Sequence, residues 1–204
     1  MLFADLLNQP GVDEVLELRN RFGLLAFHGG LEGGTIEVAT AAADAAGASL
    51  YAVVQPSELR WHVPSHLVTA AASPALGRFL DHVEVAVAVH GYGRRDRPVD
   101  LLLGGRNRVL AAELAAHLRA HLPGYVVVDD LERVPRPMRG MHRDNPVNRP
   151  PGGGVQLELP PRVRGATAAV TDRGRPCTPH PGLVTALVAT VAGYSTSKVP
   201  PARQ

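Results

Sequence analysis

Cysteine is nearly absent from this sequence. Cys177 is the single cysteine among 204 residues, so the chain cannot form an intramolecular disulfide and cannot build a zinc site from several thiolates. Any metal ion that the chain binds must therefore be held by histidine and carboxylate side chains.

Long basic blocks and long apolar runs are also missing. The formal net charge is only +2, and local arginine excesses at residues 133–149 and 162–175 either face an acidic substrate or are simply solvated. The longest apolar stretch, Leu183 to Gly193, is too short to cross a bilayer, and residues 1–11 lack the apolar run of a secretory signal. We therefore expect a cytoplasmic protein that binds neither nucleic acid nor membranes.

Aromatic residues make up 4% of the chain, whereas hydrophobic residues make up 45%. This composition is that of an ordinary globular protein whose core consists of small and branched aliphatic side chains. The length favours one domain. We expect that domain at residues 1–194, followed by a disordered tail at residues 195–204.

Short apolar runs alternate with amphipathic segments along the chain. The apolar runs predict strands at Leu24–Phe27, Leu50–Val54, Val83–Val89, Leu101–Leu103, Tyr125–Val128 and Val155–Leu159, with a further one at Thr167–Thr171. The amphipathic segments predict helices at Asp13–Phe22, at Ile36–Ala46 after a Thr35 cap, from Ser73–Pro74 onward, at Val109–Leu122 after an Asn107 cap, and at Pro181–Ala192. This alternation predicts a three-layer α/β/α sandwich around a mixed, mainly parallel central sheet. Residues 129–153, rich in Pro, Arg and Gly, are the expected substrate-side loop.

Two of the predicted strands end in His-Gly, at His28 and at His90. Ligands bind at the carboxyl ends of strands in such sheets, and zinc in hydrolytic sites commonly takes two histidines and one carboxylate. His28, Glu32 and His90 meet this requirement, because the glycines around Glu32 allow a tight loop. They form a candidate Zn²⁺ site, although a histidine beside glycines is often only a turn residue.

A series of short segments carries a family resemblance. In chain order they are His28 to Glu37 (HGGLEGGTIE), Ser49 to Tyr51 (SLY), Trp61 to His66 (WHVPSH), Val87 to Gly91 (VAVHG), Leu103 to Asn107 (LGGRN), Asn145 to Arg149 (NPVNR) and Gly153 to Leu159 (GGVQLEL). Each segment is weak evidence alone, but the ordered set is specific. Together they resemble the poly-gamma-glutamate hydrolase family over nearly the whole chain.

The resemblance implies a zinc-peptidase-like, carboxypeptidase-like α/β fold and a zinc-dependent amidohydrolase that cleaves gamma-glutamyl amide bonds. It implies His28, Glu32 and His90 as the metal ligands. Glu37, in the same segment, replaces Glu32 as the carboxylate ligand if the loop cannot bring Glu32 to the ion; otherwise it orients a histidine ligand or simply supports the loop. His62 either lines the pocket or hydrogen-bonds the loop.

Glu158 is the candidate general base. It lies in an otherwise apolar predicted strand, on the same face as Gln156. Burying an ionisable side chain in such a strand costs free energy unless it is paired or has a function. Either Glu158 removes a proton from an attacking water, or it pairs structurally with an arginine.

Arginines are the candidate groups for binding a carboxylate-rich amide substrate, whether small or polymeric. Arg149 with Asn148 resembles the Asn-Arg pair by which carboxypeptidase-type enzymes hold a substrate carboxylate. Arg162 and Arg164 follow Glu158 closely enough to share its end of the sheet. A solvated or structural role is equally open for each of these arginines.

Two other functions stay open. A relative that has lost catalysis would be a carboxylate-binding module, and an N-acyl amino acid amidohydrolase or deacylase would cleave another bond on the same scaffold. The four principal positions all hold competent residue types, which favours the enzyme.

Overall fold

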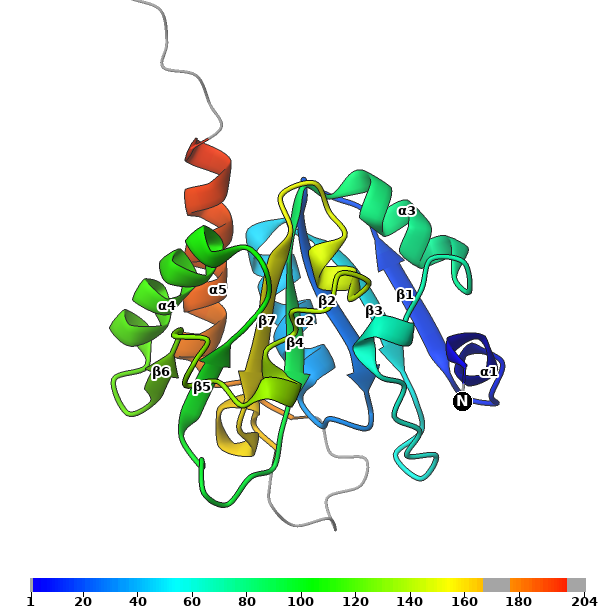
Figure 1. The fold of residues 1–204 in the computed structure, drawn as a ribbon, viewed down its shortest axis with the longest axis horizontal. Coiled ribbons are helices and arrows are strands. Elements are labelled where there is room, and N and C mark those ends of the chain that lie inside the picture. Colours follow the sequence, from blue (N-terminus) through cyan, green and yellow to red (C-terminus); the bar gives the residue numbers. More distant parts are fainter. Residues whose placement is uncertain (1, 167–176, 198–204) are drawn as a thin grey trace, which may run out of the picture.

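The computed structural model describes residues 2–166 and 177–197, which form a seven-stranded mixed sheet covered on both faces (Figure 1). The strands are β1 (Asp13–Glu17), β2 (Phe22–Gly29), β3 (Ser49–Val54), β4 (Val85–Gly91), β5 (Asp100–Leu103), β6 (Val126–Val128) and β7 (Gly154–Leu159). Their order across the sheet is β1-β3-β2-β4-β7-β5-β6. The central strands β3, β2, β4 and β7 are parallel, whereas β1 and the β5–β6 pair run antiparallel to them. The predicted α/β class with a mixed, mainly parallel sheet is confirmed.

The central strand β2 needs cover on both sides. All of its residues are buried; Leu24 and Ala26 pack into one hydrophobic cluster, and Leu25 and Phe27 pack into another. Because successive side chains of a strand point to opposite faces, a run with no polar residue is stable only between two apolar layers.

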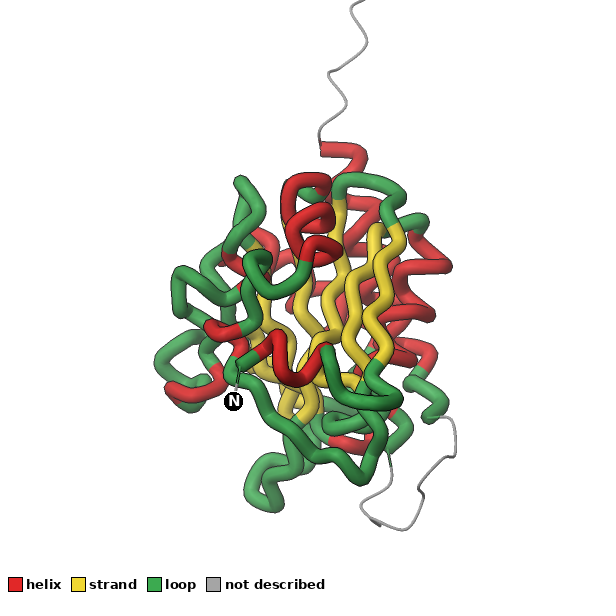
Figure 2. The backbone as a smooth tube through the Cα atoms, turned by 90° about the vertical axis from the view of Figure 1, so that its right-hand side faces the viewer, coloured by secondary structure: helices red, strands yellow, loops and turns green. Residues whose placement is uncertain are grey.

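The two layers differ in construction. The helices are α1 (Phe3–Leu7), α2 (Thr35–Ala46), α3 (Pro74–His82), α4 (Arg108–His121) and α5 (Pro181–Ser197), with short 3-10 helices η1 (Ser65–Leu67), η2 (Arg136–Met138), η3 (Pro146–Asn148) and η4 (Pro161–Arg164). Helices α2, α4 and α5 cover one face, which we call the helix face, and α1, α3 and long loops cover the other, the loop face (Figure 2). None of the helices in the described ranges has the length and apolar character needed to cross a membrane.

Of the helix caps predicted at Thr35 and Asn107, the second is confirmed, and Ser73, where a helix was predicted to begin, caps α3 as well. The side chains of Ser73 and Asn107 accept hydrogen bonds from backbone N–H groups in the first turns of α3 and α4, which satisfies donors that have no partner within the helix. The predicted cap of α2 is wrong, because Thr35 is already helical and Gly34 occupies the N-cap position.

The helix predicted at Asp13–Phe22 is also wrong, because its first residues form the edge strand β1. Val15 packs into the helix-face cluster and the adjacent Leu16 into the loop-face cluster, which is the two-sided alternation of a strand. Pairing with β3, with Val15 opposite Ala52, outweighs a weak helical spacing.

The ends of the chain differ slightly from expectation. Helix α5 continues to Ser197, past the predicted end at Ala192, so the predicted tail begins within a helix. Helix α1 was not predicted, because its five residues are too few to show a periodic pattern. Residues 198–204 and the strand predicted at Thr167–Thr171 lie outside the described residues. The single catalytic domain at residues 1–194 stays a prediction.

Candidate active site

Three parallel strands end side by side at one edge of the sheet. β2 ends near His28, β4 ends near His90, and the register of β4 with β7 places His90 opposite Glu158. The neighbouring residues Val89 and Leu157 face the helix side. By alternation, His90 and Glu158 therefore point to the loop face.

A register irregularity turns His28 toward the same face. Leu24 and Ala26 face the helix side, so strict alternation would send His28 there as well. The pairing of β2 with β3 shifts between Ala26 and Gly29, and Nε2 of His28 donates to the carbonyl of Val63, on the loop face, at 2.9 Å. An irregularity of this kind re-aims a side chain and is common next to active sites.

A tight turn after β2 brings Glu32 back to His28. The backbone N–H of Glu32 donates to the His28 carbonyl at 2.9 Å. Between them Gly30 has a φ of 79°, and a Cβ atom there would collide with the carbonyl of Gln55. Only glycine fits this position, so the glycine-rich sequence is a requirement of the turn.

His28, Glu32 and His90 form a compact cluster. Their potential ligand atoms lie within 4.8 Å of one another, and no other such group occurs in the part of the chain that the structure describes. Nδ1 of His28 is 2.8 Å from Oε1 of Glu32, and Nδ1 of His90 is 3.4 Å from Oε2. The backbone N–H of Gly91 also donates to Oε2 of Glu32 at 2.8 Å, so the end of β4 fixes the carboxylate.

The cluster holds one ionised carboxylate between two imidazoles. Burial would raise the pKa of Glu32, but His28 and His90 outweigh burial and hold that pKa well below its ordinary value. Burial would likewise lower the pKa of His90, but the charge of Glu32 outweighs it and raises that pKa. Glu32 and His90 thus each stabilise the charged form of the other.

The arrangement fits a metal ion. Since a carbonyl can only accept, Nε2 of His28 carries a proton, and Nδ1, the nitrogen that faces Glu32, is the one that could bind an ion in place of its own proton. Histidine ligands of metals are commonly held through their other nitrogen in this way. Nε2 of His90 is buried and has no hydrogen-bond partner within the described residues. Two imidazoles and one carboxylate are the donor set of many hydrolytic zinc sites.

Glu158 lies beside this cluster at the end of a chain of buried amides. Nε2 of Gln156 donates to Oε1 of Glu158, and Nδ2 of Asn145 donates to Oε1 of Gln156, both at 2.8 Å. Burial first, and then the charge of Glu32, raise the pKa of Glu158 although His90 opposes them. A carboxyl group with a raised pKa, oriented by an amide rather than by an arginine, suits proton transfer.

Glu37 lies outside the cluster. It belongs to α2, and its Oε1 accepts a hydrogen bond from the backbone N–H of Cys177 at 3.4 Å. Of the two carboxylates that the sequence left open, the structure brings Glu32 to the histidines.

Arg164 ties the site loop to the sheet. Its guanidinium group, on η4, donates to the backbone carbonyls of Gly33, Tyr92 and Leu159, and the residue is only 4% exposed. These contacts join the loop of Glu32 to the ends of β4 and β7. Its predicted contact with substrate stays a prediction.

The other predicted substrate-binding residues do not belong to the cluster. The amide of Asn148 donates to two carbonyls of the preceding loop, at 2.7 and 3.0 Å. Arg149 is exposed and lies 3.5 Å from the carboxylate of Asp144, and Arg162 is exposed on η4. Their roles toward a substrate also stay predictions.

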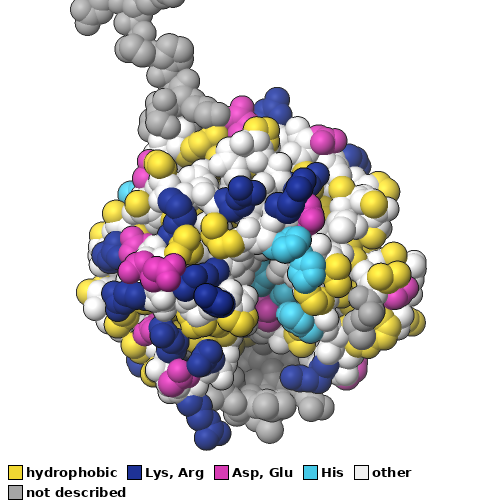
Figure 3. All heavy atoms as spheres, viewed as in Figure 1, with side chains coloured by type: hydrophobic (Ala, Val, Ile, Leu, Met, Phe, Trp, Pro, Cys, Tyr) yellow, Lys and Arg dark blue, Asp and Glu magenta, His cyan; other side chains and the backbone are white. Residues whose placement is uncertain are grey.

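Further histidines surround the cluster on the loop face. The ring of His62 lies 4.8 Å from that of His28, centroid to centroid, and burial and the neighbouring His28 lower the pKa of His62. The rings of His66 and His142 lie 4.8 Å apart and connect two loops. Figure 3 shows histidine side chains gathered beside a hollow on this side of the molecule.

Sequence reasoning missed most of the groups that orient the site. These are the carbonyl of Val63, the N–H of Gly91 and the amide of Asn145. Each acts across segments far apart in the chain or through the backbone, where residue type carries no signal. Of the residues that orient the site, Gln156 alone carried a signal in the sequence, namely its two-residue spacing from Glu158.

The sheet, with a His-Glu-His cluster and a buried carboxyl group at its strand ends, has the fold of metallo-carboxypeptidases. A metallo-carboxypeptidase from Burkholderia cenocepacia shares the fold, with a TM-score of 0.53 at 9% identity over 96% of this chain and 67% of that one.

Among proteins of this fold, the chain belongs to the poly-gamma-glutamate hydrolase family, whose sequence model matches residues 6–174. A bacteriophage poly-gamma-glutamate hydrolase is similar in structure, with a TM-score of 0.76 and 26% identity over 92% of this chain and 91% of the phage chain. The zinc-free form of a protein named YNDL has the same fold, with a TM-score of 0.71 and 22% identity over 94% of each chain. No curated protein matches the chain in sequence. The protein is therefore an enzyme, a hydrolase.

Proposed function

We propose that this hydrolase is zinc-dependent and cleaves gamma-glutamyl amide bonds. The observation that carries the proposal is the placement of a buried Glu158 beside the cluster of His28, Glu32 and His90. A donor set for zinc and a carboxyl group with a raised pKa at one edge of one sheet are the two components that metal-assisted amide hydrolysis requires.

His28, Glu32 and His90 would hold the ion. A bound zinc ion supplies Lewis acidity toward the scissile carbonyl and lowers the pKa of the attacking water. The chain itself contributes the proton transfers. Glu158 removes a proton from the water, because its oriented carboxylate is a stronger base than an ordinary glutamate, and then returns that proton to the leaving amine.

The neighbouring residues keep these groups in position. The Val63 carbonyl fixes the tautomer of His28, and Gln156 fixes one oxygen of Glu158, so the other oxygen is available for the water. Arg164 holds the loop of Glu32 against the strand ends. This preorganisation reduces the motion that the reaction requires.

The substrate class rests on the family and on the chemistry of the surroundings. A gamma-linked glutamate chain presents one carboxylate per residue, and Arg149, after η3, and Arg162, on η4, are exposed guanidinium groups. The phage relative acts, by its name, on such a polymer.

The test combines metal content with turnover. We expect about one zinc ion per purified chain, lost in His28→Ala and Glu32→Gln and kept in Glu37→Gln, which is the matched control because it removes the same charge nearby. The loaded wild type should release glutamate from gamma-linked glutamyl peptides and leave alpha-linked ones intact. Glu158→Gln should keep its zinc while kcat falls by about 10²–10⁴-fold. A wild type that takes up no zinc, or a Glu158→Gln variant of full activity, would refute the proposal.

A further inference from the structure

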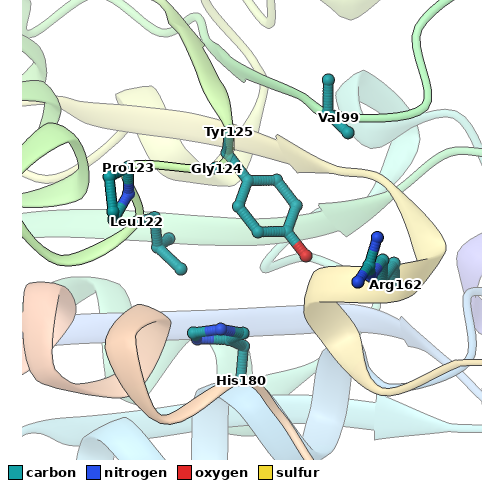
Figure 4. Close-up of a pocket in the computed structure, with 7 residues that line it drawn as sticks. All are labelled: Val99, Leu122, Pro123, Gly124, Tyr125, Arg162 and His180. Atoms are coloured by element: carbon teal, nitrogen blue, oxygen red, sulfur yellow. The ribbon is translucent and has the colours of Figure 1, made fainter.

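A second hollow lies away from the histidine cluster, where β6 begins. It has a volume of about 400 Å³ and is lined by Val99, Leu122, Pro123, Gly124, Tyr125, Arg162 and His180. In Figure 4 the hydroxyl of Tyr125 points toward Arg162, and His180 borders the same space. The volume lies within the range of small-molecule sites, which combine apolar walls with a few polar groups.

Each polar side chain that lines this cavity, Tyr125, Arg162 and His180, can donate a hydrogen bond. Nδ1 of His180 accepts the backbone N–H of Gly182 at 3.1 Å, so its Nε2 carries the proton. Tyr125 offers a hydroxyl and Arg162 a guanidinium group, and within the described residues neither side chain has a hydrogen-bond or ion-pair partner.

The charge in the cavity is positive. Burial raises the pKa of Tyr125 and the guanidinium of Arg162 opposes that rise, which is what a cation facing the hydroxyl should do. No carboxylate is among the lining residues. A guanidinium group flanked by two neutral donors matches a carboxylate, and the side chains of Val99 and Leu122 would contact the methylene groups that carry it.

The cavity lies on the same edge of the sheet as the candidate active site. β5 runs antiparallel to β7 with Leu102 opposite Glu158, so Val99 lies beyond the end of β7. The N–H of Val126 donates to the carbonyl of Val99 at 2.9 Å, which places Tyr125 there too.

One short helix connects the two places. Arg164 of η4 reaches the Glu32 loop through the carbonyl of Gly33, and Arg162 of the same helix lines the cavity. A chain bound at the histidine cluster would therefore pass η4 on its way to the cavity.

We propose that this cavity is a subsite that binds one carboxylate of the substrate chain at a distance from the scissile bond. The proposal rests on the proposed function for the identity of the chain. Short substrates end before the cavity, whereas long ones reach it, so the subsite makes the enzyme favour long gamma-linked chains.

The kinetic test uses the zinc-loaded full chain and compares a gamma-glutamyl dipeptide with a long oligomer. In Arg162→Gln the ratio of the KM for the oligomer to the KM for the dipeptide should rise about tenfold, with the kcat for the oligomer unchanged, because a remote contact binds substrate and transition state equally. Tyr125→Phe should give a smaller rise. Arg78→Gln, which removes an exposed arginine from α3, is the control and should leave the ratio unchanged. An unchanged ratio in Arg162→Gln overturns the proposal.

A binding test separates this proposal from the proposed function. The zinc-loaded Glu158→Gln chain, labelled with ¹⁵N, is titrated with the long oligomer and, separately, with glutarate. Amide shifts of Gly124 and Gly182 with the oligomer, lost in the double variant with Arg162→Gln, support the subsite even if the wild type hydrolyses nothing. Shifts with glutarate but not with the oligomer would mean that the cavity takes a free small acid and would overturn the subsite, as would the absence of shifts with either.

Discussion

The helix face and the loop face of the sheet carry different tasks. The helix face is packed with small aliphatic side chains of α2, α4 and α5 against the strands. The loop face holds His28, His90, Gln156 and Glu158 among short helices and long loops. Both faces have an apolar cluster, but the loop face also buries the ionisable side chains of the candidate site, which cost free energy unless they are paired. We therefore expect substitutions on the loop face to lower metal binding and activity, and substitutions on the helix face to lower stability.

The largest expected effect is a loss of chemistry on the loop face. His90→Ala should abolish zinc binding and lower kcat/KM by at least about 1,000-fold, since Lewis-acid assistance is worth several kcal/mol. The matched control is His117→Ala, on α4 of the helix face, which should keep both metal and activity. Elemental analysis and hydrolysis of a gamma-glutamyl peptide measure the two properties. Full zinc content in His90→Ala would contradict the assignment.

A substitution that leaves a void in the core of the helix face should lower stability and leave the chemistry unchanged. Leu114 is fully buried in α4, so Leu114→Ala should lower the free energy of unfolding by about 2–5 kcal/mol. Zinc content and KM should not change below the melting transition. Val109→Ala, at a position of the same helix that is 74% exposed, should cost no more than about 0.5 kcal/mol. Denaturant melts of both variants provide the comparison, and a change in KM for Leu114→Ala would show that the faces are not independent.

A smaller effect should come from the amide chain behind Glu158. Gln156→Leu removes the donor to Oε1 of Glu158 and leaves the amide of Asn145 without its acceptor. Loss of such an orienting contact typically costs 10–100-fold, so kcat should fall by roughly that factor while KM and zinc content stay constant. Steady-state kinetics with a metal assay test this. If kcat and zinc were lost together, Gln156 would be maintaining the fold of the site rather than orienting Glu158.

The sequence predicts the sheet better than it predicts the site. Apolar runs that end in His-Gly locate β2 and β4, because a strand buried on both faces has few alternatives. Alternation alone would have turned His28 toward the helix face, and only the shift in pairing with β3 sends it to the other. That shift depends on strand pairing, which no local pattern records.

The choice between Glu32 and Glu37 shows the same limit of local patterns. It depended on a turn that returns Glu32 to His28 through a backbone hydrogen bond. β1 was mistaken for a helix since its apolar spacing suits both structures, and its pairing with β3 decided between them.

The smallest effect, a pH dependence, concerns how tightly the loop face binds its ion. Glu32 raises the pKa of His90 above its ordinary value of 6.5. Only a neutral imidazole binds a metal, so a raised pKa extends proton competition to a higher pH. Zinc affinity should therefore be weak below this pKa, strengthen as the pH rises through it, and level off above it. Competition titrations with a chelator across neutral pH measure the affinity. An affinity that is already constant at and below pH 6.5 would mean that Glu32 does not favour the protonated form of His90, and the electrostatic coupling between them would have to be abandoned.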